Sequence, residues 1–375
     1  MIGSTMQLGL TNARQDRTAP RMIAVVAAVL LLGSGCSQSA DDDPLATGTD
    51  SEATAGFLAS AAERSAATAS RFEVEFSMVM RDPASGVDID FGGQAGYGEQ
   101  QGNRWSMVMD LASMMEEMVT QMGEPMPPEL AGLDMTVEMV TEPEATYMRA
   151  PGLAELSDMV TAEGGPPNMY GPLAGIGDAW GRIDIATIGD RYGMADLQSA
   201  LGGAQIGDPS VFLDVVAGAD QVRELGEDEV RGVAVRGLAA DVSMGDVMAQ
   251  QGIDPEEYLS ALGGGLPPGN AAALDEFLTG TLPMEVWVDG DGYVRRLSFD
   301  LDLAELVSSL DLPSAPPGDL EMSFGTSIDF FDYGDESISV EPPEEWVDVT
   351  DEFTQFLETP ILEPGMGPGI GPPSI

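Results

Sequence analysis

The sequence predicts an α+β fold dominated by an antiparallel β-sheet with one buried face. Apolar and polar residues alternate strictly over residues 71–81, as in a strand with one buried and one solvated side. The same alternation returns in several later segments. By contrast, an Ala- and Ser-rich stretch over residues 54–70 has its apolar residues at helical spacing. Together, these patterns predict strands packed on a small number of helices.

The first part of the domain is expected to form one helix followed by strands. The helix covers residues 54–70, and its small side chains would let a sheet approach closely. Strands are expected at residues 71–81, 87–91, 105–111, 135–139 and 146–148. The second strand ends in Gly92, Gly93, Gly96 and Gly98, and glycines in strands often mark bulges or sharp curvature.

The rest of the domain is expected to mix short helices with hairpins. Helices are expected at residues 111–122, 152–163, 193–201 and 210–217, with another starting at Asp254. Two strands within 222–241 are expected to meet at a turn over Gly226–Asp228. The clearest hairpin joins residues 284–288 to 297–303 through the turn 289–292. A strand at 320–330 and an edge strand at 338–340 follow.

The only cysteine, Cys36, follows a segment with the layout of a secretory signal. Arg14, Arg17 and Arg21 precede an uncharged apolar run over residues 22–32, which is too short to span a bilayer. The segment 31–36, Leu-Leu-Gly-Ser-Gly-Cys, resembles a lipobox, although Gly33 stands where that pattern usually has Leu. The resemblance implies cleavage before Cys36 and lipidation of its thiol. We therefore expect a protein anchored to the outer face of the cell membrane.

This interpretation divides the chain into four parts. Residues 1–35 form the signal peptide, and the acidic, polar residues 36–53 form a flexible tether. Residues 54–357 form the folded domain with helical insertions. The Pro- and Gly-rich residues 358–375 form a disordered tail.

The charged residues exclude several classes of function. The chain has 64 acidic residues against 15 arginines, with no lysine and no histidine, and its formal net charge is −49. Such a chain repels nucleic acid. Without histidine or lysine there is no Ser-His-Asp triad, imidazole zinc site, Schiff base or P-loop lysine. A carboxylate-pair hydrolase stays open, but so many acidic residues form such pairs by chance.

Three segments resemble envelope lipoproteins of the LppX/LprG type. They are Gly-Glu-Asp-Glu-Val-Arg-Gly-Val-Ala-Val-Arg-Gly at 226–237, Leu-Pro-Met-Glu-Val-Trp-Val-Asp-Gly-Asp-Gly-Tyr-Val-Arg-Arg-Leu at 282–297, and a closing stretch from Phe331-Asp-Tyr-Gly-Asp to Pro342-Pro343. The resemblance implies a LolA-like half-barrel, in which a strongly curved antiparallel sheet wraps over helices around an apolar cavity. It also implies binding of an acylated lipid or glycolipid, for transport or display, without catalysis or cofactors. This family pattern lacks the long insertions at 111–132 and 151–175.

Apolar residues on the expected strands, together with a methionine-rich stretch, are the candidate ligand contacts. Methionine side chains are flexible and polarisable, so they suit variable acyl chains. Residues 111–122 are expected to form a helix whose Met114, Met115 and Met118 cover a cavity mouth, although apolar stripes of this kind are more often core packing. The candidate residues are Phe76, Met78, Trp105, Met107, Met109, Met114, Met115, Met118, Met135, Met139, Val286, Phe299 and Phe324.

Other candidate sites have simpler interpretations. The turn 289–292 could hold calcium, but it lacks a distal bidentate Glu and is more typical of a hairpin. Arg295, Arg296, Asp300 and Asp302 are expected on a solvated face, with lipid headgroup contact as the alternative. The tryptophans at 105, 180, 287 and 346 could stack on a sugar, but packing on the sheet is favoured.

The sequence therefore predicts a lipid-anchored envelope protein that holds an acyl-chain lipid in an apolar cavity. The alternative is a non-catalytic surface interaction module with a filled core, whose acidic exterior meets an envelope partner. A carboxylate-pair hydrolase is a weaker third option.

Overall fold

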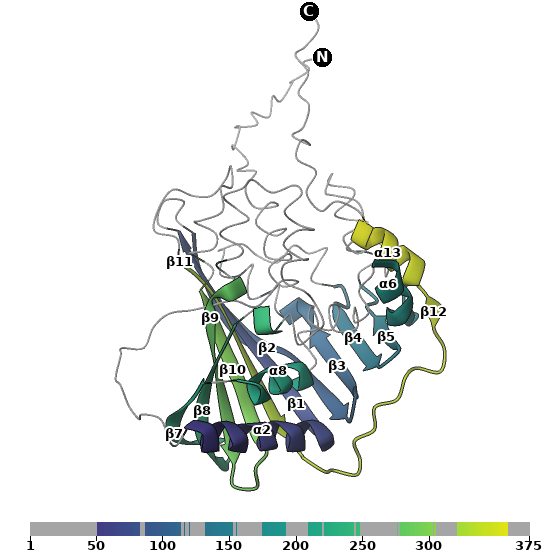
Figure 1. Ribbon diagram of the computed structural model, residues 1–375. Coiled ribbons are helices and arrows are strands. Elements are labelled where there is room, and N and C mark those ends of the chain that lie inside the picture. The colour runs from purple at the N-terminus through teal and green to yellow at the C-terminus, as the bar shows by residue number, and fades with distance from the viewer. Residues whose placement is uncertain are drawn as a thin grey trace, which may run out of the picture. The chain divides into compact units, whose positions relative to one another are not determined.

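The computed structural model has one large β-sheet and four helices of eight or more residues in its described part (Figure 1). The structure describes residues 51–82, 87–113, 116, 120, 132–152, 155, 175–192, 209–219, 221–243, 245–247, 276, 278–302, 304 and 321–358. Cys36, the tether, the tail and the expected helices at 152–163, 193–201 and 254 lie wholly or almost wholly outside these residues. No helix within the described residues has the length and apolarity needed to cross a membrane.

Twelve strands form this sheet, in the order β12-β6-β5-β4-β3-β2-β1-β11-β10-β9-β8-β7. All neighbours are antiparallel except β12 and β6, which run parallel. The strands are β1 (Ser70–Asp82), β2 (Val87–Gln101), β3 (Arg104–Asp110), β4 (Thr136–Glu142), β5 (Ala145–Arg149), β6 (Gly181–Asp184), β7 (Gln221–Val230), β8 (Val233–Ser243), β9 (Thr281–Asp289), β10 (Val294–Asp302), β11 (Glu321–Phe331) and β12 (Val347–Asp348).

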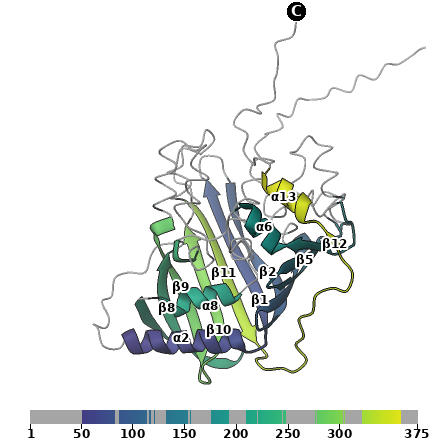
Figure 2. The ribbon, with the colours of Figure 1, turned by 45° about the vertical axis from the view of Figure 1, so that its right-hand side comes forward.

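Two helices pack on the β7–β10 part of the sheet. Helix α2 (Ser51–Ala67) contacts helix α8 (Pro209–Ala217), and α2 also contacts β7 and β10 while α8 contacts β8 (Figures 1 and 2). The shorter α6 (Ile185–Tyr192) and α13 (Thr350–Glu358) contact each other, and α13 also contacts β6. The prediction of an α+β fold with a predominantly antiparallel sheet is therefore confirmed.

The main core joins one face of the sheet to these two helices. Leu58 and Ala61 of α2 and Leu213 of α8 are almost fully buried in the same cluster as Phe72 of β1 and Val286 of β9. At roughly 25 cal/mol for each Å² of apolar surface removed from water, burial of this face is the main stabilising term. The alternation predicted for residues 71–81 is seen in the burial of β1, where every even-numbered residue from Ser70 to Met80 is buried.

Strand β2 continues through the glycines that were expected to end it. The register with β1 shifts between Val74 and Glu75, whose partners are Gly96 and Gln94, so Ala95 is the extra residue of a bulge. The expected bulge is thus present, but the strand resumes after it. A β-carbon at Gly96 would lie 2.6 Å from the carbonyl oxygen of Val108, so this position needs glycine.

The predicted turn at Gly226–Asp228 is wrong. These residues lie inside β7, and the two-residue turn is Arg231-Gly232, because Val230 pairs with Val233. Both turn residues have positive φ, 49° and 79°, as this hairpin type requires. Gly226 instead lies at a bulge where the β7–β8 register shifts. A glycine at a bulge and a glycine in a turn carry the same sequence signal.

The predicted edge strand at 338–340 is also wrong. Ile338 and Val340 are buried, but this segment has no strand structure. Its backbone binds a side chain instead, because Gln101 donates to the carbonyl of Ile338 and accepts from the amide of Val340, both at 3.4 Å. The short elements β6, α6, β12 and α13 were not predicted, since few residues carry their pattern.

Candidate functional site

Every described candidate for acyl-chain contact lies on a strand or next to one, and all but one are buried. Met109 is partly buried and packs against the core. The buried candidates are Phe76, Met78, Trp105, Met107, Met135, Met139, Val286, Phe299 and Phe324. Met114, Met115 and Met118 lie outside the described residues, so the proposed cover over a cavity mouth stays a prediction. Residues 111–113, 116 and 120 of that segment are helical.

Methionines gather on neighbouring strands within this buried face. Met107 of β3 is the cross-strand partner of Met139 of β4, and Met139 is the partner of Met148 of β5. Met109 and Met135 pack against the same cluster. The structure therefore brings together methionines that are up to 41 positions apart in the printed sequence. A surface made of unbranched thioether side chains can adapt to ligands of different shape.

A row of polar side chains crosses the same face beside these methionines. Ser70, Gln100 and Trp105 are cross-strand partners on β1, β2 and β3, and their exposed fractions are 0%, 1% and 2%. Thr141 and Thr146 continue the row on β4 and β5 and bond to each other at 3.1 Å. Gln100 is polar although it lies in phase with the buried positions Gly96 and Gly98 of β2, and only this feature marks it in the sequence.

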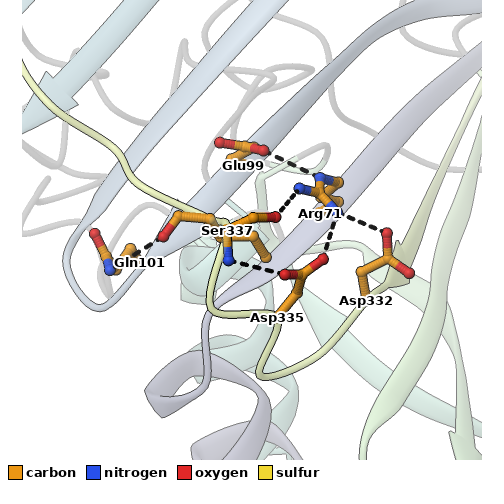
Figure 3. Close-up of polar contacts among 7 residues, drawn as sticks. Arg71, Glu99, Gln101, Asp332, Asp335 and Ser337 are labelled. Carbon is orange, nitrogen blue, oxygen red and sulfur yellow. Dashed lines mark hydrogen bonds and ion pairs between the residues drawn. The ribbon is translucent and has the colours of Figure 1, made fainter.

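On the opposite face of the sheet, Arg71 holds residues 332–337, which follow β11, next to this row (Figure 3). The guanidinium of Arg71 donates to Glu99 at 3.0 Å, Asp332 at 2.9 Å, Asp335 at 3.0 Å and the hydroxyl of Ser337 at 2.9 Å. These bonds, led by the one to Asp332, raise the pKa of Arg71 above its usual range. Bonds donated by the backbone and hydroxyl of Ser337, and then by Arg71, lower the pKa of Asp335.

The opposite, exposed face of the sheet carries a polar groove of about 450 Å³. It spans β1, β11, β10 and β9, and the end of the β7–β8 hairpin also lines it. The lining residues are Glu75, Phe76, Ser77, Asp228, Val230, Glu285, Trp287, Arg296, Ser298, Asp300, Gly325, Thr326 and Ser327. From the sequence, Phe76 was predicted to contact an acyl chain, Trp287 to pack on the sheet, and Arg296 and Asp300 to lie on a solvated face, but the groove that joins them was not predicted.

Ion pairs and an aromatic ring border this groove. Arg231, in the β7–β8 turn, pairs with Glu73 of β1 and Asp329 of β11, and Asp329 also binds Arg296 at 2.6 and 2.8 Å. The ring of Trp287 lies against Gly237, where a β-carbon would be 2.5 Å from it. This contact fits the interpretation that Trp287 packs on the sheet, although the residue is only partly buried.

The prediction for Arg295 is wrong, because this residue does not lie on a solvated face. Its side chain is 17% exposed, and its Nε donates to Asp289 at 2.6 Å. The Cζ atom of its guanidinium lies 5.1 Å from the centre of the Tyr333 ring. The register of β10 with β9 shifts between Val294 and Arg296, so Arg295 and Arg296 do not follow the regular alternation of the strand. Arg296 and Asp300 do lie beside the exposed groove.

The Asp289–Gly292 turn uses its buried carboxylate internally. One oxygen of Asp289 accepts from the backbone amides of Asp291 and Tyr293, both at 2.9 Å, and the other accepts from Arg295. The structure shows the expected hairpin between β9 and β10. Among the described residues, no group of three acidic or cysteine side chains could hold a metal ion.

Two other tryptophans lie near the β5–β6–β12 edge, each with an arginine. The guanidinium of Arg182 lies 5.1 Å from the ring centre of Trp346, which also meets Tyr147 edge-on at 6.5 Å. Arg149 lies 5.2 Å from the ring of Trp180. One face of each ring is thus covered by a guanidinium, which reduces the surface open to a sugar.

A second hollow, of about 540 Å³, lies between the β2–β3 and β4–β5 turns. It is polar and lined by Gln101, Asn103, Arg104, Glu142, Pro143 and Glu144. Glu142 accepts from the hydroxyl of Tyr147 at 3.0 Å and lies 3.7 Å from Arg104. None of the predicted acyl-chain residues lines this hollow.

No family model matches this chain, and no curated protein matches it by sequence. It is similar to the crystal structure of LprF from Mycobacterium bovis, with 12% identity and a TM-score of 0.34 over 78% of this chain and 98% of that one. It is also similar to the Mycobacterium tuberculosis lipoprotein LppX, with 8% identity and a TM-score of 0.34 over 77% and 99%. A DUF1329 family protein from Desulfovibrio piger matches with 12% identity and a TM-score of 0.23 over 78% and 96%.

LppX is thus among these solved structures. It is also one of the two proteins after which the LppX/LprG type of lipoprotein, which three segments of the sequence resemble, is named. The identities and TM-scores are low, so the comparison transfers no site or ligand to this chain.

Proposed function

We propose that this protein is a lipid-anchored, non-catalytic envelope protein that binds an acyl-chain lipid or glycolipid against the buried face of its sheet. In this proposal the sheet is the curved wall of a half-barrel, and α2 and α8 fill one part of it. The acyl chain contacts the methionine-rich strip on β3–β5 and the apolar residues of β1 and β9–β11. Desolvation of the chain supplies the binding free energy, at about 25 cal/mol per Å².

The observation that carries the proposal is the methionine strip formed by Met107, Met139 and Met148 at matching register positions. Cores that need one fixed packing favour branched side chains with well-defined rotamers, whereas methionine accepts several arrangements. Helices α2 and α8 contact strands at the other end of the sheet, β7, β8 and β10. The strip is therefore the part of the buried face where exchange of a ligand would disturb these two helices least.

The predicted anchor supports the same role. Lipidated Cys36 would hold the domain at a bilayer, and the uncharged, apolar run before it supports export. Two or more acyl chains outweigh the repulsion between anionic lipids and a chain of net charge −49. An anchored carrier or display protein would meet its lipid at that surface.

Native mass spectrometry of the full chain purified from its own envelope tests this function. We expect a bound lipid, released by organic solvent and identified by its fragments. A paired substitution, Met107→Asp with Met139→Asp, should abolish lipid retention, whereas the exposed Glu344→Gln should retain it. Circular dichroism of each variant shows whether it is folded. A folded native protein that never carries lipid, even after incubation with lipid vesicles, would refute the proposal.

The exposed groove supports the second candidate, a surface interaction module. In the described part of the chain, Glu75, Glu285 and Asp300 line this groove without an ion-pair partner, while Glu73 and Asp329 beside it are paired with arginines. The carboxylates that line the groove (Glu75, Asp228, Glu285 and Asp300) outnumber its one arginine, Arg296, so the groove next to the partly buried ring of Trp287 suits a cationic side chain of an envelope protein.

Titration with a lysine-rich peptide separates the two candidates. The interaction module predicts salt-sensitive binding that changes tryptophan fluorescence and is weakened by Glu285→Gln, while Glu344→Gln, on the exposed C-terminal segment, leaves it unchanged. Equal binding by both variants would mean that only the overall negative charge attracts the peptide.

A further inference from the structure

We propose that the row Ser70, Gln100 and Trp105, here named the polar row, binds an uncharged hydrogen-bonding group of the lipid, such as an ester carbonyl. The ligand would then be an acyl ester rather than a bare hydrocarbon or a free fatty acid. This inference rests on the proposed function and adds the chemistry that selects the ligand.

The polar row contains side-chain atoms that are buried without a hydrogen-bond partner. In the described part of the chain, these atoms are the hydroxyl oxygen of Ser70, both amide atoms of Gln100 and the indole Nε1 of Trp105. The residues are neighbours in the register, Ser70 with Gln100 and Gln100 with Trp105. Buried polar atoms in native proteins are almost always paired, so a contiguous group without partners needs a cause.

The unpaired atoms form a set that a carbonyl and a hydroxyl could satisfy. The amide nitrogen of Gln100 and the indole nitrogen of Trp105 are donors, which match a carbonyl oxygen. The amide oxygen of Gln100 is an acceptor, and the Ser70 hydroxyl can act as either. A hydrocarbon offers none of these groups, and it would leave every atom of the set unpaired.

The chemistry of the row disfavours a charged headgroup. Ser70, Gln100 and Trp105 are neutral, and so are Thr141 and Thr146, which continue the row. Arg71, next along β1, has its donors engaged by Glu99, Asp332, Asp335 and Ser337. A carboxylate placed at the row would lose its hydration without gaining a cation, which is unfavourable.

The location of the row connects it to the proposed acyl-chain surface. The next inward-facing row along the same strands contains Phe72, Gly98, Met107 and Met139. Two residues along a strand span about 6.6 Å, a short distance on the scale of an acyl chain. An ester at the polar row would therefore place the start of its acyl chain on the methionine strip.

Paired probes that differ only in the carbonyl test this inference. The full chain is titrated with dioctanoyl glycerol, with the dioctyl ether of glycerol, which lacks the carbonyls, and with octanoate. We expect the ester to bind about tenfold more tightly than the ether, because the ether leaves the donors unpaired, and octanoate to bind most weakly.

Two substitutions identify the residues responsible. Gln100→Met and Trp105→Phe remove the polar atoms and leave apolar side chains in their place. Each should bring the ratio of ester affinity to ether affinity closer to one while the affinity for the ether is preserved. Gln94→Met, at an exposed position of the same strand, should leave the ratio unchanged. Thermal unfolding without lipid shows that each variant is folded.

The possible outcomes separate this inference from the proposed function. If the native chain binds ester and ether equally, or if both variants keep the ester preference, the polar row does not select the ligand and the inference is wrong, while lipid binding stands. If the folded native chain binds no probe, and no lipid is found on the protein from its envelope, the proposed function itself fails.

Discussion

The aromatic ring of Phe72 occupies the space that a side chain at Gly98 would need. The two residues are cross-strand partners in β1 and β2, and a β-carbon on Gly98 would lie 2.4 Å from Cζ of Phe72 and 2.0 Å from the carbonyl oxygen of Ser106. Phe72 itself is fully buried. The absent side chain therefore allows β1, β2 and β3 to pack a large ring at their centre.

Gly98→Ala is expected to destabilise the protein by about 2–3 kcal/mol, because neither the ring nor the backbone oxygen can move away without strain. Gly56→Ala is the matched control. Gly56 is exposed in α2, nothing lies within 4 Å of its absent β-carbon, and alanine there should stabilise by about 0.5–1 kcal/mol. Urea unfolding of both variants checks the pair. Equal effects at the two positions would contradict the packing argument.

Arg71 is expected to stabilise the junction of β1, β2 and the C-terminal segment. Arg71→Met leaves Glu99, Asp332 and Asp335 close together without their shared cation (Figure 3). We expect a lower thermal midpoint, with a larger decrease at low ionic strength, since salt screens repulsion between exposed charges. Arg71→Lys keeps the charge but lacks the forked geometry of the guanidinium, so its thermal midpoint should lie between those of Arg71→Met and the native chain. A decrease that does not depend on salt would point to packing instead.

The carboxyl of Asp335 is expected to contribute stability that acid removes. Its pKa is lowered in the folded protein, mainly by bonds from Ser337, so its contribution is present above the ordinary value near 4 and is lost as the pH falls through the folded pKa. Acid also relieves repulsion across a chain of net charge −49, which acts in the opposite direction.

The comparison with Asp335→Asn separates these two effects. The variant should be less stable than the native chain at pH 7, and the difference should shrink as the pH falls below the ordinary carboxyl pKa of about 4. Thermal midpoints across this range give the measurement. A difference that is constant with pH would show that Asp335 has the same pKa when folded and unfolded.

Strand alternation predicted most of the sheet, because residues with one buried face follow a period of two regardless of their partners. The pairing of β1 with β11 could not be predicted in the same way, since Phe72 and Phe330 meet over a separation that no local pattern encodes. The turn at Arg231-Gly232 was missed because Gly226, Gly232 and Gly237 give similar signals, and only the register distinguishes bulge from turn.

The candidate site was predictable in its apolar part and not in its polar part. The described methionine and aromatic candidates, such as Met107 and Phe324, are buried as their alternation required, except Met109, which is partly buried. Their contact with a ligand stays a prediction. The polar row could be predicted only from the pairing of β1 with β2 and of β2 with β3 together, because these two pairings place Ser70 and Trp105 beside Gln100. The exposed groove likewise combines residues of five strands.

Cys36 is expected to carry the membrane anchor. In cells, Cys36→Ser should shift the protein from the membrane fraction to the soluble fraction, because a serine cannot form the thioether to a diacylglyceryl group. Ser37→Ala, at the next position, is the control and should stay in the membrane. Mass spectrometry of the native protein should show the mass of a lipid on the residue that follows the signal peptide. An unmodified Cys36 in membrane-bound protein would contradict this anchor.

Asp289 is expected to be a structural residue of the β9–β10 turn and not a calcium ligand. Its carboxylate is 3% exposed and binds two backbone amides and the largely buried Arg295. Asp289→Ala should cost about 3–5 kcal/mol, because it leaves the arginine without its partner. Asp289→Asn keeps an acceptor for the amides and should cost less. Millimolar calcium should leave the thermal midpoint of the native chain unchanged, and a clear rise would restore the calcium hypothesis.

Tyr333 is expected to control how the protein loses stability in alkali. Its hydroxyl donates to the carbonyl of Val294 at 2.6 Å, and its ring stacks on Tyr293 with centres 4.4 Å apart. Burial raises the pKa of Tyr333 above its usual range. The folded state therefore resists ionisation of this phenol. The contribution of Tyr333 to the free energy of unfolding is fully present below the ordinary tyrosine pKa near 10 and is lost as the pH rises above it.

The composition makes this effect measurable. The chain has no lysine, so apart from Cys36 and the amino terminus only tyrosines titrate between about pH 9 and pH 11. Tyr333→Phe should cost about 1 kcal/mol at pH 8 through the lost hydrogen bond, and should then lose less stability than the native chain between pH 8 and pH 10.5. Tyr97→Phe is the control, because Tyr97 is 55% exposed and its removal should leave the alkaline slope unchanged. Urea unfolding at the two pH values gives both slopes, and a Tyr333→Phe slope equal to the native one would assign the alkaline loss to other tyrosines, such as Tyr147, whose pKa burial also raises.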